Sequence, residues 1–282
     1  MTDEKDPTQE VLRVWDSIAP DWERHREQLF ERARSVSDWL VEAIAPEPGQ
    51  TVLEVSAGTG ETGFLVAERV GSSGRVLSTD LAPGMVEAAR RGAEARGLTN
   101  VDHRVMDAQS MDLADESVDA VLSRFGLMLM PEPARALSEA ERVLRPGGRL
   151  AFAVWGPPDG NPWTVLLGMT LTQLGYQPPG DPFGPGGMFS LAPPGVAHNL
   201  TAAAGFSGIR VEELPTHQPF ESFDEYWGYQ REVGGAFALM IRSLSSEEVD
   251  RIRSALEEAA QPFQSDDGYT FPGLALGIAA SK

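Results

Sequence analysis

The sequence predicts an α/β fold in which helices cover both faces of a doubly wound, seven-stranded sheet. Between residues 50 and 155, short apolar segments alternate with segments of helical length and periodicity. This alternation is typical of a parallel sheet whose strands are joined by helices. The chain has 282 residues, of which 41% are hydrophobic, so it can bury a large core.

Apolar runs indicate the strands, and apolar residues three or four apart indicate the helices. The predicted strands are 51–55, 75–79, 101–106, 118–123, 149–155, 209–214 and 274–279, and the predicted helices between them are 60–70, 83–96, 133–144, 162–174 and 196–205. Residues 8–45 and 222–260 are also predicted to be helical. We expect the first of these regions to break at Pro20, because proline cannot donate the helical hydrogen bond.

Composition argues against several classes of function. With 23 Lys and Arg against 42 Asp and Glu, the formal charge is −19, which repels phosphate backbones and disfavours a nucleic-acid partner. Because cysteine is absent, disulfides, thiolate nucleophiles and thiolate metal sites are impossible, and the four histidines lack ligand spacing, so no metal site is predicted. The acidic start does not resemble a signal peptide, and no run approaches the roughly 20 apolar residues that span a bilayer. We therefore expect a cytoplasmic protein without a membrane span, of undetermined oligomeric state.

A glycine-rich turn follows the first predicted strand and opens a helix. The segment GTGETG at 58–63 matches the G-x-G-x-x-G pattern of dinucleotide-binding folds. Glycines let the backbone approach a ligand, and the free N–H groups at the start of the helix attract negative charge. The same pattern also arises as a purely structural turn, so it does not identify a cofactor by itself.

Asp80 ends the second predicted strand, 20 residues after Gly60. This spacing suits a carboxylate that accepts hydrogen bonds from the two hydroxyls of a ribose. NAD and other adenosine cofactors meet this condition equally well. An acidic cap for the helix that begins at Pro83 is the structural alternative.

The loops taken together resemble those of class I S-adenosylmethionine (SAM)-dependent methyltransferases. VLEVSAGTG at 52–60 resembles the first motif of that family, although Ser56 stands where glycine is commoner. The segments STDLAPGM at 78–85, VMDAQ at 105–109, DAVLS at 119–123 and VLRPGGRL at 143–150 resemble the later motifs, in the same order. The resemblance covers about 50–155 and is strongest to the small-molecule group that includes the quinone C-methyltransferases.

The resemblance implies a Rossmann-like fold with helical lid insertions and three regions. Residues 1–48 are expected to form an N-terminal helical lid, and 49–155 the SAM-binding core. Residues 156–282 are expected to hold acceptor-side insertions and the remaining core strands. The implied cofactor-binding residues are Trp22, Glu54, Ser56, Gly58, Gly60, Asp80, Leu81, Met85, Asp107, Ala108, Gln109, Ser123 and Arg124.

Each implied residue has a stated role and some have a structural alternative. The glycine turn would face the carboxylate of the cofactor, Glu54 its ammonium, Asp80 its ribose and Asp107 the adenine amino group. The backbone after Asp107 would reach the ring edge. Leu81, Met85 and Met106 would sandwich the adenine, although core packing explains the methionines equally well.

Two further residues could face the reacting methyl group. Trp22 would close over the cofactor, or would pack between helices. Arg124, after the fourth strand, would bind an anionic group of the acceptor; pairing with a neighbouring carboxylate is the simpler expectation.

On this reading the activity is methyl transfer to oxygen or carbon of a small, largely apolar or aromatic metabolite. Alignment and water exclusion supply much of the rate, because the donor is already activated. No general base is compelled, and His198, His217 and Tyr176 are weak catalytic candidates. Aromatic residues in the insertions after 155 suggest a roofed apolar pocket. The alternatives are an NAD-linked oxidoreductase, and a protein on this fold that binds or rearranges a metabolite without methylating it.

Overall fold

The sheet has the strand order β3-β2-β1-β4-β5-β8-β6, and a two-residue strand, β7, pairs with β8 outside this path. The computed structural model describes residues 6–282. The strands are β1 (Thr51–Val55), β2 (Arg75–Asp80), β3 (Val101–Val105), β4 (Val118–Arg124), β5 (Leu144–Trp155), β6 (Ser207–Phe220), β7 (Gln264–Ser265) and β8 (Gly268–Ser281). β1 to β5 pair in parallel, whereas β8 runs antiparallel to β5 and to β6. The predicted doubly wound α/β fold is confirmed, with one antiparallel strand among the seven.

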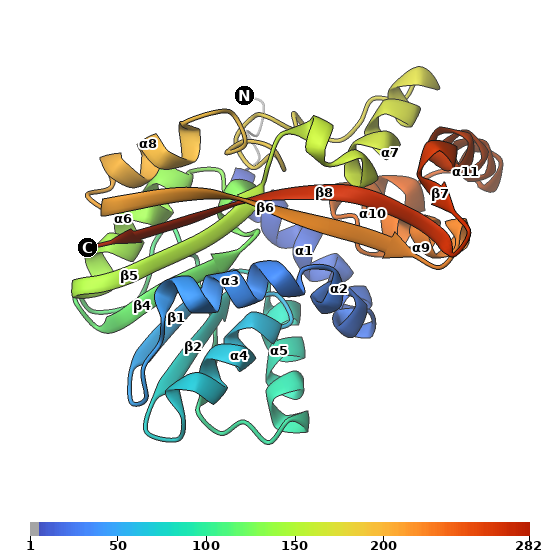
Figure 1. Ribbon diagram of the computed structural model, residues 1–282. Helices are drawn as coiled ribbons and strands as arrows, with labels where there is room; N and C mark the ends of the chain where they lie inside the picture. Colours follow the sequence, from blue (N-terminus) through green and yellow to red (C-terminus); the bar gives the residue numbers. More distant parts are fainter. Residues whose placement is uncertain (1–5) are drawn as a thin grey trace.

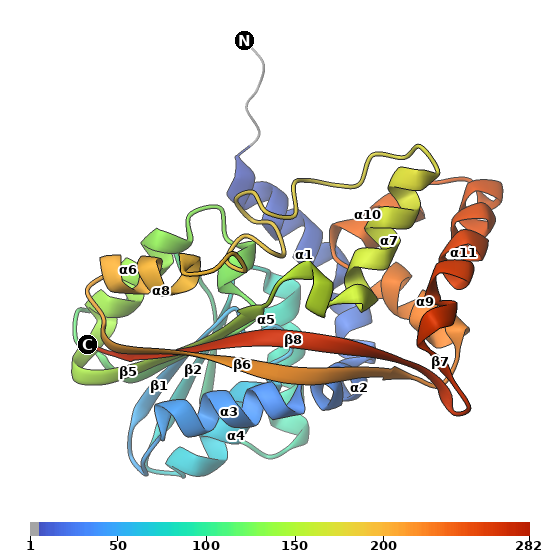
Figure 2. The same cartoon turned by 45° about the horizontal axis from the view of Figure 1, so that its top comes forward.

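Helices cover both faces of this sheet. They are α1 (Pro7–Arg24), α2 (Arg26–Arg32), α3 (Arg34–Ile44), α4 (Glu61–Val70), α5 (Pro83–Ala95), α6 (Pro133–Val143), α7 (Pro162–Gln173), α8 (Val196–Ala203), α9 (Phe223–Glu232), α10 (Ala236–Arg242) and α11 (Ser246–Ala260). Figure 1 shows α3 and α4 on one face and α6 and α8 on the other. In Figure 2, β6 and β8 extend beyond the parallel strands, and α7, α9, α10 and α11 gather around that extension.

Burial along the strands follows their place in the sheet. The central strands β1 and β4 are buried along most of their length, because helices cover both faces. The edge strand β3 is partly or fully exposed at every residue. Because β1, β2, β4 and β5 run parallel, their carboxyl ends meet at one edge of the sheet. Ligands bind at this edge in open α/β folds.

The expected helix break at Pro20 is wrong. α1 continues through Pro20 to Arg24, and the chain bends at His25 instead. A proline removes only one helical hydrogen bond. Here Ile18 and Ala19 are buried against Met85 of α5, and this packing offsets the loss.

The last two strands of the sheet are longer than the predicted segments 209–214 and 274–279. β6 and β8 pair continuously from Ser207↔Ser281 to Phe220↔Tyr269, apart from one irregularity near Ser207. Prolines in both strands concealed this length, because a proline cannot donate to a sheet ladder. The prolines of β6 are tolerated because β6 is an edge strand. Pro272 of β8 is tolerated because β5 pairs with β8 only between Ala275 and Ser281.

The N-terminal segment divides between two positions. α3 packs against β4 and β5 and forms part of the layer that covers the sheet, and the division into a lid at 1–48 and a core at 49–155 stays a prediction. α1 contacts α5, α9 and α10, so it joins the core to the insertions. Residues 1–5, which begin the expected lid, lie outside the described part of the chain.

Candidate functional site

The glycine turn connects β1 to α4 at the carboxyl edge of the sheet. Ser56, Gly58 and Gly60 have left-handed φ angles of 53°, 56° and 89°. A Cβ atom at Gly60 would lie 2.8 Å from the ring of Phe64, so glycine is required there for space as well as for conformation. Ser56 adopts the left-handed conformation despite its side chain, which accounts for glycine being commoner at this position.

Trp22 of α1 lies over this turn. A Cβ atom at Gly58 would be 3.8 Å from the Trp22 ring. The indole Nε1 of Trp22 donates a hydrogen bond of 3.1 Å to the carbonyl oxygen of Val233, beyond the end of α9. The ring also meets Trp15 edge-on, at 5.3 Å between centroids. The structure therefore places the expected lid residue against the turn and ties it to the insertion.

Asp80 joins the loops after β1 and β2. Its Oδ2 accepts from the Gly58 backbone N–H at 2.9 Å, and its Oδ1 accepts from the Ala82 N–H at 2.9 Å. Burial raises the pKa of Asp80, while these two hydrogen bonds act in the opposite direction. Ala82 is the N-cap of α5 and receives no side-chain cap, so Asp80 does not serve as a helix cap in the usual sense.

Glu54 lies beneath the turn and is only 2% exposed. Its Oε1 accepts from the Gly63 N–H at 2.9 Å, and its Oε2 accepts from the Ser78 hydroxyl at 3.3 Å. A Cβ atom at Gly63 would be 2.1 Å from Oε2, so the third glycine of the motif makes room for this carboxylate. Burial raises the pKa of Glu54 to about 8.

The loop after β3 is held by its own side chains. Asp107 Oδ1 accepts from the Gln109 N–H at 2.8 Å, and Gln109 Oε1 accepts from the Glu132 N–H at 2.8 Å. Ala108 and Gln109 are buried, whereas Asp107 is partly exposed at the sheet edge. These hydrogen bonds fix the conformation of the loop and leave the Asp107 carboxylate partly exposed at the edge.

The three apolar residues expected around the adenine have different surroundings. Leu81 and Met106 are partly exposed. Met85 is 1% exposed and packs with Ile18, Ala82 and Ala238, which are the contacts of a core residue. Met85 therefore supports the packing of α1 on α5.

Two polar side chains at the end of β4 are incompletely paired. The Ser123 hydroxyl is buried and has no hydrogen-bond partner among residues 6–282. Arg124 donates from Nη1 to the Ser37 hydroxyl at 3.1 Å. Within the described residues Arg124 has no carboxylate within 4.0 Å, so the expected ion pair is wrong. Burial lowers the pKa of Arg124, since no direct partner compensates the lost hydration.

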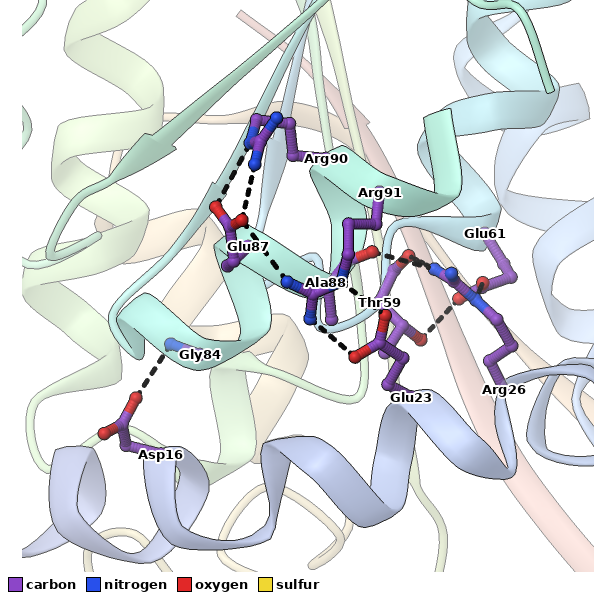
Figure 3. Close-up of polar contacts among 10 residues, drawn as sticks. All are labelled: Asp16, Glu23, Arg26, Thr59, Glu61, Gly84, Glu87, Ala88, Arg90 and Arg91. Carbon is purple, nitrogen blue, oxygen red and sulfur yellow. Dashed lines mark hydrogen bonds and ion pairs between the residues drawn. The ribbon is translucent and has the colours of Figure 1, made fainter. Parts of the chain in front are cut away.

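Sequence patterns did not single out a buried ion pair that holds α2 against the glycine turn. Arg26 donates from Nε to Glu61 Oε1 at 2.7 Å and from Nη2 to the Thr59 carbonyl at 2.6 Å (Figure 3). The second Glu61 oxygen accepts from the Thr59 hydroxyl at 2.5 Å. Acidic residues are common in the first turn of a helix, so Glu61 gave no functional signal, and Arg26 comes from a distant element.

Further polar contacts fasten α1 to α5 beside this pair (Figure 3). The Gly84 N–H donates to Asp16 Oδ1 at 2.8 Å, and Arg91 pairs with Glu23 at 2.6 Å. The N-terminal helices thus cover the carboxyl edge of the sheet through contacts to the glycine turn and to α5.

A row of aromatic rings runs from the end of β4 into the insertions. Phe125 stacks on Trp155 at 3.9 Å, Trp155 meets Trp163 at 5.0 Å, and Trp163 meets Tyr229 of α9 at 5.9 Å. Phe125 has a φ of 61°, a strained conformation for a residue with a Cβ atom. Such strain often marks functional sites, and here it fixes a ring beside Arg124.

The weak catalytic candidates lie apart from this edge. His198 is exposed on α8, and His217 is exposed on β6 opposite Pro272. Tyr176 follows α7, and its hydroxyl receives a hydrogen bond of 2.5 Å from Arg251 of α11. The structure does not bring these three side chains together.

Two negative findings concern residues 6–282. No group of three acidic or histidine side chains there is arranged to hold a metal ion. None of the helices there combines the length and apolar character needed to cross a bilayer.

Comparison with known proteins agrees with the loop motifs. Residues 53–152 match the family described as "Methyltransferase domain". Aklanonic acid methyltransferase DauC of Streptomyces sp. (strain C5) is 34% identical over 143 residues, which cover 51% of this chain and 64% of that protein. The ubiquinone/menaquinone biosynthesis C-methyltransferase UbiE of Ruegeria sp. (strain TM1040) is 32% identical over 154 residues, which cover 53% of this chain and 61% of that protein. The matches thus span less than two thirds of these relatives.

The fold is shared with solved structures at low sequence identity. A putative methyltransferase from Bacillus halodurans C-125 aligns with a TM-score of 0.58 at 21% identity, covering 87% of this chain and 98% of that one. SAM is the cofactor of this family. Residues 53–152 are therefore similar to SAM-dependent methyltransferase domains, including those of the quinone C-methyltransferases, and the chain has the fold of solved methyltransferases.

Proposed function

We propose that the whole chain transfers a methyl group from SAM to oxygen or carbon of a small, largely apolar or aromatic metabolite. The observation that carries the proposal is the position of Asp80. Its carboxylate links the glycine turn to the loop after β2, at the point where the ribose of an adenosine cofactor is held in such folds. A charge of −19 favours a small molecule over a nucleic acid as the acceptor.

The residues at this edge fit the cofactor. Asp80 can accept from ribose hydroxyls through its remaining lone pairs, and Asp107 can accept from the adenine amino group. The buried, unpartnered Ser123 hydroxyl offers a further hydrogen bond at the end of β4. When bound, the sulfonium supplies an already activated methyl group.

The chain itself contributes alignment and exclusion of water. Trp22 covers the glycine turn, and the α1–α2 segment is fastened over it by Arg26. Phe125, which is partly exposed and stacks on the buried Trp155, gives an acceptor ring a fixed surface next to the same edge. Orientation of this kind contributes up to roughly 7–11 kcal/mol to a displacement reaction.

Calorimetric titration with S-adenosylhomocysteine tests the proposal. Asp80→Ala removes two charge-assisted hydrogen bonds to the ribose, each worth about 1.5–3 kcal/mol, so the affinity should fall at least about 100-fold. Asp102→Ala is the matched control, because Asp102 lies partly exposed on the edge strand β3 and pairs with Arg75. Its affinity should stay within a factor of two of the native value.

Since Asp80 also connects two loops, Asp80→Asn is titrated in parallel and the folded fraction of each variant is checked by circular dichroism. Binding of NAD in place of the sulfur nucleoside would overturn the proposal. Turnover of an acceptor without release of S-adenosylhomocysteine would overturn the proposed methyl transfer.

A further inference from the structure

We propose that Arg124 and Tyr229 form a recognition site for an anionic oxygen of the methyl acceptor, which makes the acceptor a planar aromatic acid. The inference rests on the proposed function and specifies its substrate class. It follows from the pairing of the charged groups around Arg124, the unused hydroxyl of Tyr229 and the aromatic row between them.

Arg124 keeps most of its hydrogen-bonding capacity. A guanidinium has five N–H donors, and the side chain of Arg124 uses one hydrogen bond, to Ser37, among the described residues. Two other partly buried arginines are paired: Arg26 contacts Glu61 at 2.7 Å, and Arg32 contacts Glu225 at 2.5 Å. Arg124 is partly buried, and its unused donors are not enclosed by the protein, so they are accessible to a ligand that supplies the missing negative charge.

The two carboxylates that influence Arg124 electrostatically are committed elsewhere. Both Glu61 oxygens are occupied, by Arg26 and by the Thr59 hydroxyl. One Glu54 oxygen accepts from the Gly63 N–H and the other from the Ser78 hydroxyl. Burial also favours the neutral form of the Glu54 side chain. Neither therefore neutralises Arg124 through a direct ion pair.

Tyr229 supplies a hydroxyl that has no hydrogen bond in the described part of the chain. Three residues earlier on the same helix, the Tyr226 hydroxyl donates to the Trp163 carbonyl at 2.7 Å and so has a structural role. Burial raises the pKa of Tyr229 to about 12, although Arg32 and Arg124 lie close enough to oppose this shift. The phenol therefore keeps its proton at neutral pH and can donate it to an anionic oxygen.

The aromatic row connects the two groups. Phe125 directly follows Arg124 and stacks nearly parallel on Trp155, with 11° between the ring planes. Trp155 and Trp163 continue the row to the Tyr229 ring. An aromatic acceptor packed against the partly exposed rings of Phe125 and Tyr229 would direct one carboxylate or ionised ring oxygen toward the Arg124 guanidinium and the Tyr229 phenol.

Two probes of the same shape and different charge test the inference. The wild-type protein is titrated with 2-naphthoate and with 2-naphthamide in saturating S-adenosylhomocysteine, and tryptophan fluorescence reports binding. We expect the acid to bind at least tenfold more tightly than the amide. Arg124→Gln, which can still bond to Ser37, should lower the affinity for the acid at least tenfold and leave that for the amide within twofold.

Tyr229→Phe should weaken binding of the acid about fivefold or more, whereas Tyr226→Phe, its matched control, should preserve the preference for the acid. Equal binding of the two probes, failure of both to bind, or an unchanged affinity of Arg124→Gln for the acid would overturn the inference. Calorimetry with S-adenosylhomocysteine alone separates the two proposals. If that ligand binds but the acid is not preferred, only the acceptor assignment fails.

Discussion

The cofactor edge and the acceptor side differ in how their buried polar groups are paired. At the cofactor edge, Glu54, Glu61, Asp80 and Asp107 all accept hydrogen bonds from nearby backbone or side-chain donors. In the second region, which is the end of β4 together with α9, the Ser123 and Tyr229 hydroxyls have no hydrogen bond among residues 6–282, and Arg124 has one. Buried polar groups are normally satisfied, so the unpartnered Ser123 hydroxyl calls for a reason, and Arg124 and Tyr229 keep accessible donors beside it. We infer that the first region is built to hold its own shape and the second to receive a ligand.

This contrast predicts opposite effects of substitutions on stability. Removing a partner at the cofactor edge should destabilise the fold, because it leaves a buried group unpaired. Removing an unpaired group on the acceptor side should cost nothing or stabilise the fold, at the expense of binding.

The largest effect is expected for Arg26→Ala. It leaves Glu61, whose side chain is 2% exposed, without its cation, and such losses amount to about 3–5 kcal/mol of unfolding free energy. Arg91→Ala breaks a pair with Glu23 in which the arginine is 47% exposed, and should cost at most about 1 kcal/mol. Urea denaturation measures both. Equal losses of unfolding free energy in the two variants would show that the Arg26–Glu61 pair stabilises the fold no more than the exposed Arg91–Glu23 pair.

A smaller effect should appear in the pH dependence of stability. The pKa of Glu54 rises from an ordinary 4.5 to about 8 on folding, so the folded state binds its proton more tightly than the unfolded state. The resulting stability is present below the unfolded value and is lost as the pH rises through the folded one. Between pH 6 and 9 the native protein should lose at least about 1.4 kcal/mol, the equivalent of one pKa unit.

Glu54→Gln should lose less over the same range, as measured by urea denaturation at several pH values. Glu87→Gln, on the exposed face of α5, is the control and should follow the native curve. If the unfolding free energies of the native protein and of Glu54→Gln fell with pH at the same slope, the raised pKa of Glu54 would be contradicted.

The smallest effect, and the one of opposite sign, is expected for Ser123→Ala. Removing a buried hydroxyl that has no partner should raise the unfolding free energy by about 1 kcal/mol. Ser37→Ala removes a buried hydroxyl that bonds to Arg124 and Thr62, and should lower it by a similar amount. A destabilised Ser123→Ala would remove one support for the contrast between the two regions.

The cofactor edge could be predicted from the sequence because its residues are close together in the chain or follow successive strands. Asp80 bonds to Ala82, and Asp107 bonds to Gln109, so short segments define both loops. The parallel order of the strands then brings the loops to one edge. Even so, the roles in binding SAM came from family resemblance and stay predictions.

The acceptor side could not be predicted in the same way. The pairing of Arg32 with Glu225 and the contact of Trp163 with Tyr229 join residues far apart in the sequence. The aromatic residues were visible as a concentration in the insertions, but nothing local distinguished Tyr229 from Tyr226. His198 and Tyr176 were weak candidates because only their residue types suggested catalysis. Residue type does not indicate how far a side chain lies from the carboxyl edge of the sheet.

Local patterns by themselves determined the doubly wound fold, the glycine turn and the carboxylates at or just after the ends of β1, β2 and β3, because apolar periodicity and turn chemistry act over a few residues. Tertiary packing alone decided that α1 runs through Pro20, that Arg26 pairs with Glu61, and that Arg124 stays without a carboxylate. The physical reason is that a charge is satisfied by whatever side chain the fold places within a few ångströms, and the chain order does not specify that neighbour.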